Sequence, residues 1–128
     1  MIYLDTSVLL AQLLAEDRLP AATLWKETLV SSRLLEYEVW TRINALGLAG
    51  THGEDTRALI GRIALLELAP QVLARALEPF PVKVRTLDAL HLASLNFLKE
   101  NGQRVTLATY DARQGAAADA LGFEVTAP

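Results

Sequence analysis

The chain has 128 residues with a formal net charge of −3 and no cysteine, which excludes disulfides, thiolate nucleophiles and Cys-ligated zinc. Hydrophobic residues make up 52% of the chain, yet no apolar run approaches the roughly 20 residues that a membrane-spanning helix needs. At this length and composition we expect one domain over residues 1–128, with a sheet covered on both faces by helices and no association with a membrane.

The first predicted element is a short buried strand over residues 1–5, followed by a helix over residues 8–15 that Thr6 or Ser7 can cap. No basic region precedes the strand, and Asp5 interrupts its apolar run. This is not the pattern of a secretory signal, so we expect a cytoplasmic protein.

Strands and helices alternate along the rest of the chain. Further strands are predicted over residues 28–32, 65–69, 104–109 and 123–126. Helices are predicted over residues 20–25, 33–46, 70–77, 86–101 and 112–121. Another helix, opened by Glu54 or Asp55, is expected after a turn at residues 50–53, and Thr86 is the predicted N-cap of the long helix. Alternation of this kind implies a mostly parallel sheet with right-handed crossovers.

Two acids follow predicted strands directly. Asp5 ends the first strand, and Asp111 follows the strand 104–109. Both junctions combine an apolar strand, a hydroxyl residue and an acid. Ligand sites of open parallel sheets form beyond the carboxyl ends of the strands, where both acids are expected. Capping of the next helix is the competing role for each acid, although Thr6 and Ser7 offer alternative caps that leave Asp5 free.

A third acid is expected on the helix predicted over residues 33–46. Glu36 and Glu38 lie two positions apart in this helix, so they face nearly opposite sides and only one can point at the site. Glu38 is assigned to the site, since it shares a face with Leu34, Leu35 and Arg42. Glu36 lies toward Arg33 and solvent, which is the ordinary position of a glutamate.

Asp88 stands in the first turn of its predicted helix, where the helix dipole alone favours an acid by a few tenths to about 1 kcal/mol. Its small apolar neighbours, such as Ala89 and Ala93, indicate a helix end pressed into the core, which favours a functional role. His91, about one turn further on, is better explained as a packed or hydrogen-bonded histidine than as a metal ligand. Four carboxylates that converge on one edge repel one another, and a divalent cation is the usual resolution.

Four stretches of the chain, in order, resemble the PIN-domain ribonucleases, in particular the VapC-type toxins of bacterial and archaeal toxin–antitoxin pairs. The stretches are MIYLDTS, SSRLLEYEVWTR, RTLDALHLAS and TLATYDARQGAAADALG. The resemblance spans essentially the whole chain. It implies a PIN-like three-layer α/β/α sandwich around a central, mostly parallel sheet of four to five short strands.

The resemblance also assigns site residues. In the family the acid that ends the first strand binds metal, and Asp5 matches it. The helix acid lies six residues after a Ser that ends the second strand, an interval that Ser32 and Glu38 reproduce. The acids of the third and fourth stretches complete the set. The expected catalytic and metal-binding acids are thus Asp5, Glu38, Asp88 and Asp111, supported by the hydroxyls of Thr6 and Thr109.

The function that this resemblance implies is a metal-dependent endoribonuclease that uses Mg²⁺ or Mn²⁺ and acts as the toxin of a VapBC-type pair. Its expected partners are RNA, a VapB-type antitoxin and a second copy of the chain. The apolar helix near the N-terminus and the region of Trp40 could supply a homodimer face, although burial in the core explains the same residues. A stand-alone RNA-processing nuclease and a catalytically silent PIN module that binds proteins are the alternatives.

The negative net charge argues at first against an RNA ligand, because phosphate binding normally needs a basic surface. Nine of the twelve basic residues are Arg, however, and Arg makes planar, bidentate contacts to phosphate. An acidic metal pocket with an Arg rim is therefore compatible with the composition. Arg42, Arg85 and Arg113 are candidate phosphate contacts, and for each an ordinary surface role is at least as good an explanation.

Two other acidic Mg²⁺ folds fit the chain less well. A phosphoacceptor receiver domain needs a Lys after one of its last strands, and the three lysines, Lys26, Lys83 and Lys99, are not placed there. A phosphatase with an Asp-x-Asp motif is disfavoured because Ser7 occupies the second position after Asp5.

Overall fold

The computed structural model describes all 128 residues and contains one five-stranded sheet. Its strands are β1 (Ile2–Leu4), β2 (Leu29–Ser32), β3 (Ala64–Leu66), β4 (Thr106–Ala108) and β5 (Glu124–Thr126). They lie in the order β3-β2-β1-β4-β5, and every neighbouring pair is parallel. The predicted sheet of four to five mostly parallel strands is therefore confirmed, and it is parallel throughout.

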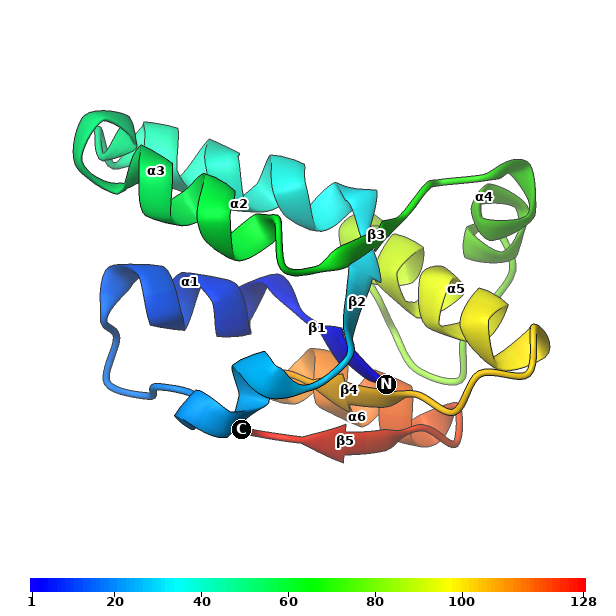
Figure 1. The fold of residues 1–128 in the computed structure, drawn as a ribbon. Helices are drawn as coiled ribbons and strands as arrows, with labels where there is room; N and C mark the ends of the chain where they lie inside the picture. Colours follow the sequence, from blue (N-terminus) through cyan, green and yellow to red (C-terminus); the bar gives the residue numbers. More distant parts are fainter.

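Six α-helices and one short 3₁₀-helix connect these strands. They are α1 (Thr6–Leu14), η1 (Ala22–Lys26), α2 (Arg33–Ala45), α3 (Ala49–Ile60), α4 (Pro70–Ala76), α5 (Thr86–Glu100) and α6 (Ala112–Ala120). In Figure 1, α1, α2 and α3 lie to the left of the sheet, and α4 and α5 lie to its right. None of these helices combines the length and the apolar character that a membrane crossing requires.

Each face of the sheet has its own hydrophobic core, because successive residues of a strand point to opposite faces. In β1, Leu4 belongs to the core formed with α1, α2 and α3, whereas Tyr3 belongs to the core formed with α5 and α6. In β4, Ala108 and Leu107 divide between the two cores in the same way. The chain therefore forms the expected three-layer α/β/α sandwich.

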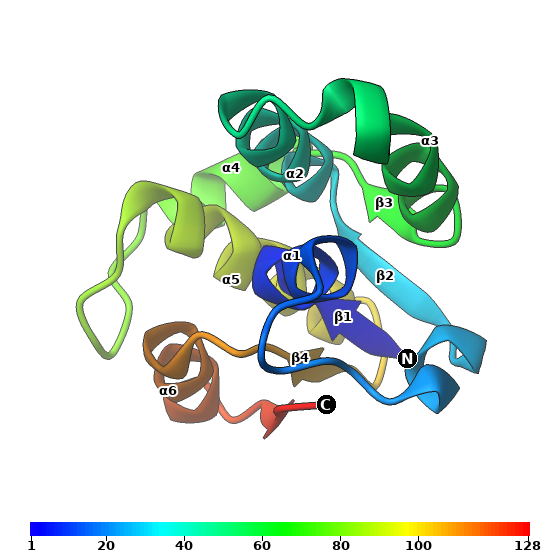
Figure 2. The ribbon, with the colours of Figure 1, turned by 90° about the vertical axis from the view of Figure 1, so that its left-hand side faces the viewer.

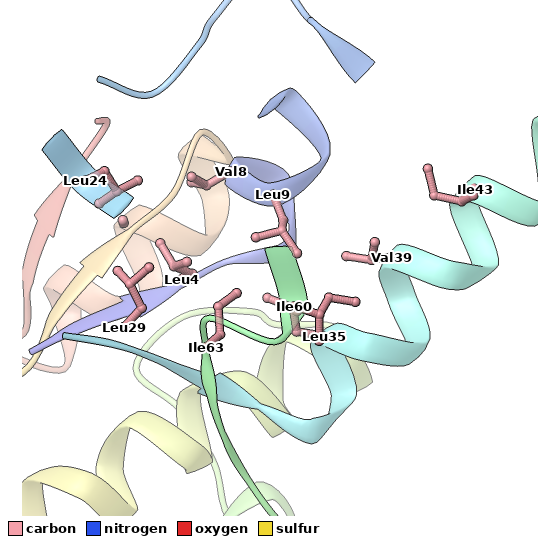
Figure 3. Packing of buried hydrophobic residues seen from close by; sticks show 11 residues of the cluster. Leu4, Val8, Leu9, Leu24, Leu29, Leu35, Val39, Ile43, Ile60 and Ile63 are labelled. Carbon is pink, nitrogen blue, oxygen red and sulfur yellow. The ribbon is translucent and has the colours of Figure 1, made fainter. Parts of the chain in front are cut away.

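The first core is built largely from one side of α2. Leu35, Val39 and Ile43 recur every four residues, so they form a single stripe that packs toward Leu9 of α1 (Figure 3). Trp40 is partly buried against the same cluster. Core packing thus accounts for the buried apolar residues of α1 and α2, whereas Leu10, Leu13 and Trp40 are only partly covered.

Two helix starts differ from the prediction. Asp5, and not Thr6 or Ser7, is the N-cap of α1, because its Oδ2 accepts a hydrogen bond from the backbone N–H of Ser7. The hydroxyl of Thr6 donates instead across the structure to Glu38, so it is not available for capping. At the start of α5 the N-cap position belongs to Arg85, which makes no capping bond, and Thr86 is the first helical residue.

The predicted turn at residues 50–53 is wrong, since these residues lie inside α3. The chain turns earlier, at Gly47, whose φ of +68° suits a residue without a side chain. Gly53 has no special conformation, and a Cβ placed there would lie at an ordinary contact distance of 3.7 Å from the ring of Trp40 on α2. Glu54 and Asp55 also lie inside α3, so neither of them begins the helix as predicted.

Candidate active site

The sheet order creates one switch point at the carboxyl edge of the strands. The chain passes from β1 through β2 to β3 on one side, and β4 and β5 join β1 on the other side, so the order reverses between β1 and β4. In open parallel sheets, ligands bind in the crevice at such a point. In Figure 2, α1 stands in front of β1 at this place in the fold.

Both strand-end junctions of the sequence meet at the switch point. Leu4 of β1 is paired with Ala108 of β4, so Asp5 and Thr109 follow side by side. The hydroxyl of Thr109 donates to Asp5 Oδ2 at 2.8 Å, and the hydroxyl of Ser7 donates to the same oxygen at 2.5 Å. Asp5 is buried to 9% exposure, and its second oxygen, Oδ1, accepts no hydrogen bond from the protein. The carboxylate is thus held rigidly by one oxygen while the other is available for a ligand.

Glu38 is held from the opposite side by two donors to its Oε1. The hydroxyl of Thr6 donates at 3.0 Å, and Nε2 of His91 lies at 2.5 Å. Glu36 points away from this cluster, where its carboxylate lies 3.4 Å from the guanidinium of Arg33. The prediction that Glu38 rather than Glu36 faces the site is consistent with this geometry.

The Tyr3 hydroxyl connects His91 to the end of β2. The backbone N–H of Ser32 donates to the Tyr3 hydroxyl oxygen, and Nδ1 of His91 lies 2.7 Å from the same oxygen. Burial raises the pKa of the Tyr3 phenol far above its ordinary value, so the hydroxyl keeps its proton. Because a carboxylate only accepts hydrogen bonds, the N–H at Nε2 of His91 donates to Oε1 of Glu38.

His91 is almost completely buried, and its predicted role as a hydrogen-bonded histidine is confirmed. The participation of Tyr3 was not predicted from the sequence. A signal for it existed, since a tyrosine in a central buried strand needs a partner for its hydroxyl.

Asp88 lies half-buried in the first turn of α5. Burial raises the pKa of its carboxyl, and the negative charges of Asp111 and Asp5 act in the same direction. The backbone N–H of Arg85 and the nearby His91 oppose this rise in pKa. Burial is thus the main cause of the raised pKa of Asp88, and the neighbouring carboxylates of Asp111 and Asp5 add to it.

Asp111 is exposed and caps α6. Its Oδ1 accepts hydrogen bonds from the backbone N–H groups of Arg113 at 2.9 Å and Gln114 at 3.3 Å. The alternative role of a helix cap is thus real for Asp111. Capping uses a single carboxylate oxygen, so it does not exclude a second interaction through the other.

The four acids approach one edge but do not form a closed cage, since no three Asp, Glu or His side chains are close enough to surround one ion. Their chemistry nevertheless suits a hard cation, because every donor atom is a carboxylate or hydroxyl oxygen. Mg²⁺ typically keeps several of its waters and binds through only one or two carboxylates. The residues present therefore fit an ion that is held partly through water.

Two surface pockets flank the acids. The pocket on the α1 side has a volume of about 760 Å³ and includes Ser7, Arg42 and Asp111 in its lining. The pocket on the α5 side has a volume of about 360 Å³ and is lined by residues that include Asp88, Arg85 and Arg113. All three arginines named from the sequence therefore border the site, one on one side and two on the other.

Comparison with known proteins agrees with this architecture. The PIN domain family matches residues 2–120. Ribonuclease VapC46 of Mycobacterium tuberculosis is 34% identical over 130 residues, which cover 99% of this chain and 97% of that protein. Ribonucleases VapC47 and VapC35 of the same species are each 29% identical over 100% of this chain and 97% of their own length.

No solved structure is significantly similar to the chain. The family match nevertheless spans nearly every residue, and the curated relatives are matched over almost their full length. On this evidence the chain belongs to the PIN-domain family and, within it, to the VapC ribonucleases.

Proposed function

We propose that the protein is an endoribonuclease that hydrolyses RNA phosphodiester bonds with Mg²⁺ or Mn²⁺ and acts as the toxin of a VapBC-type toxin–antitoxin pair. The observation that carries the proposal is the rigidly held carboxylate of Asp5 at the switch point, with Asp88 under the influence of two further negative charges. The names of the curated relatives, all ribonucleases, support RNA as the substrate.

Each of the four acids has a proposed role. Asp5, Glu38 and Asp88 would hold the cation directly or through water, and Asp111 would complete a second ion site or orient the attacking water. When bound, such a cation makes a water more acidic and stabilises the negative charge that develops on the phosphate. Ser7 and Thr109 orient Asp5, while Thr6 and His91 orient Glu38.

Replacement of Asp5 by Asn tests the proposal. Asparagine is as good an N-cap as aspartate, so α1 should still form and the protein should fold. Cleavage of single-stranded RNA with Mg²⁺ should fall by more than about 100-fold, beyond the loss typical of residues that only orient a ligand. Normal activity in a folded Asp5→Asn protein would contradict the ligand role.

The two glutamates of α2 provide a matched comparison. Glu38→Gln should abolish cleavage, whereas Glu36→Gln removes only a contact between exposed groups and should leave activity unchanged. Equal activity of the two variants would refute the assignment of Glu38. Calorimetric titration with Mn²⁺ separates an enzyme from a silent PIN module, because absence of binding at millimolar metal would favour the module.

Two partners follow from the proposal. A small VapB-type antitoxin is expected to cover the acidic pocket, and its gene should immediately precede the gene for this chain. The protein is also expected to form a homodimer. Light scattering at micromolar concentration tests the dimer, which a monomeric mass would contradict.

A further inference from the structure

Gln114 is the one residue whose buried polar atoms have no hydrogen-bond partner. Its side chain is only 2% exposed, and both Nε2 and Oε1 are unpaired. Burial of an amide without a partner destabilises a fold. Native proteins contain few such groups, and each calls for an explanation, such as a ligand that supplies the missing partners.

Gln114 is one of the residues that line the pocket of about 360 Å³ beside Asp88, and its amide, whose two polar atoms are buried, must turn toward the pocket to meet a ligand. The pocket lies between the segment that precedes α5, the first turn of α5 and the start of α6, which are neighbours in Figure 2. Its lining consists of Lys83, Val84, Arg85, Asp88, Arg113 and Gln114. Asp88 of the acidic cluster and Gln114, whose amide has no partner, thus border one cavity.

The charge of this pocket suits a phosphate. Three basic side chains accompany a single acid in its lining. The pocket on the α1 side instead has three acids, Glu16, Asp17 and Asp111, against two arginines. A polyanion that crosses the acidic cluster would therefore be held better on the α5 side.

We propose that this pocket binds the nucleotide next to the scissile phosphate and that the Gln114 amide reads its base. An amide offers a donor and an acceptor side by side, so it can pair with a base edge through two hydrogen bonds. Lys83, Arg85 and Arg113 contact the phosphate of the same nucleotide. The volume is at the lower end of ligand pockets, about 300–1,000 Å³, and suits one unstacked nucleotide. This inference rests on the proposed ribonuclease function and adds a determinant of its specificity.

Replacement of Gln114 by Met keeps the size of the side chain and removes the amide. A random library of single-stranded RNA is digested by each protein with Mg²⁺, and the cleaved ends are sequenced. The wild type should show a base preference at one position adjacent to the cut, and Gln114→Met should weaken that preference by about fivefold or more, the discrimination expected of one bidentate contact. The melting temperature should not fall, since an unpaired buried amide is lost.

Gln103→Met is the matched control, because Gln103 is exposed and precedes β4 at the opposite edge of the sheet. It should retain the wild-type preference at every position. An unchanged preference in a folded Gln114→Met protein would overturn the inference.

A second measurement does not depend on cleavage. The chain has four glutamines, Gln12, Gln71, Gln103 and Gln114, so their side-chain amide signals are easily resolved in an NMR spectrum of ¹⁵N-glutamine-labelled protein. Addition of a short single-stranded RNA in the presence of a chelator should shift the Gln114 signals and leave those of Gln103 in place. Unmoved Gln114 signals at saturating RNA would refute the pocket. Shifted signals in a protein that cleaves no RNA would refute the nuclease and retain the pocket.

Discussion

Asp5 and Glu38 are held by hydroxyls and an imidazole instead of by Lys or Arg side chains. Asp5 accepts from Ser7 and Thr109, and Glu38 accepts from Thr6 and His91. The Lys and Arg ion pairs of the protein involve only Glu36, Glu67 and Glu78. Hydroxyl donors fix the direction of a carboxylate without cancelling its charge, so the charge of Asp5 remains for a cation from solution.

The Tyr3 hydroxyl links this arrangement to the core. Tyr3→Phe leaves the buried N–H of Ser32 and Nδ1 of His91 without their partner. The free energy of unfolding, measured in urea, should fall by about 1–3 kcal/mol. Tyr37→Phe is the control, since Tyr37 is 64% exposed, and a change within about 0.5 kcal/mol is expected. Equal effects of the two substitutions would show that the hydroxyl of Tyr3 contributes nothing specific.

Asp88 makes stability depend on pH in the metal-free protein. Because burial and the neighbouring acids raise the pKa of Asp88, the folded state keeps its proton to a higher pH than the unfolded chain does. Between the two pKa values the folded state binds more protons, so stability falls as pH rises. Asp88→Asn cannot ionise and should have the higher melting temperature at neutral pH with a chelator present.

The difference in melting temperature between Asp88→Asn and the wild type should decrease as the pH falls toward about 4, the ordinary pKa of an aspartate. Solvent screening at this half-buried side chain keeps the effect modest. Asp55→Asn, at an exposed position of α3, is the control and should follow the wild type. An Asp88→Asn protein less stable than the wild type at neutral pH would argue against crowded carboxylates.

At the level of elements, the junction between β2 and α2 sets the position of Glu38 at the site. Ser32 ends the strand and caps the helix, since its hydroxyl oxygen accepts from the backbone N–H of Leu34 at 3.1 Å. Glu38 then follows six residues later, on the turn of α2 that meets Thr6 and His91. The position of this carboxylate is therefore set by where the helix begins.

Ser32→Ala removes the cap. The free energy of unfolding should fall by about 0.5–2 kcal/mol, as is usual for the loss of a serine N-cap. Ser94→Ala is the control: this buried serine donates to the carbonyl of Leu90 inside α5, and alanine is the better helix former there. A larger loss from Ser94→Ala than from Ser32→Ala, in the same denaturation assay, would contradict the capping role.

The helices and strands were predicted well from the sequence where apolar periodicity is strong. They were predicted less well where the local residues are typical of a turn. The buried strand before Asp5 and the long helix after Arg85 were found, because burial on both faces leaves a clear apolar pattern. The start of α3 was missed, because Gly50 and Gly53 are typical turn residues and yet lie inside this helix.

Some features of the site could likewise be predicted from the sequence, and others could not. The acids at strand ends could be named from the sequence, since the carboxyl edge of a parallel sheet gathers them. The bonds of His91 to Tyr3 and Glu38 join residues 88 and 53 positions apart, and no local pattern indicates such pairs. The unpaired state of Gln114 is likewise a property of three-dimensional packing.

For the molecule as a whole, the site exists only in the folded chain. Its four acids come from positions 5 to 111 and reach one edge through β1, α2, α5 and the start of α6. An ion that they bind cannot find the same donors in the unfolded chain. Metal binding should therefore be visible as stability of the entire fold, whose total is typically about 5–15 kcal/mol.

Addition of Mn²⁺ to chelator-treated protein should raise the melting temperature in a concentration-dependent manner. A ligand that binds only the folded state stabilises it by about 2.7 kcal/mol at a hundred times its Kd. Asp55→Asn should show the wild-type shift, whereas Asp5→Asn should show little or none, because a carboxylate oxygen at the centre of the site is replaced by a weaker amide ligand. Equal shifts in Asp5→Asn and the wild type would place the ion away from the switch point between β1 and β4.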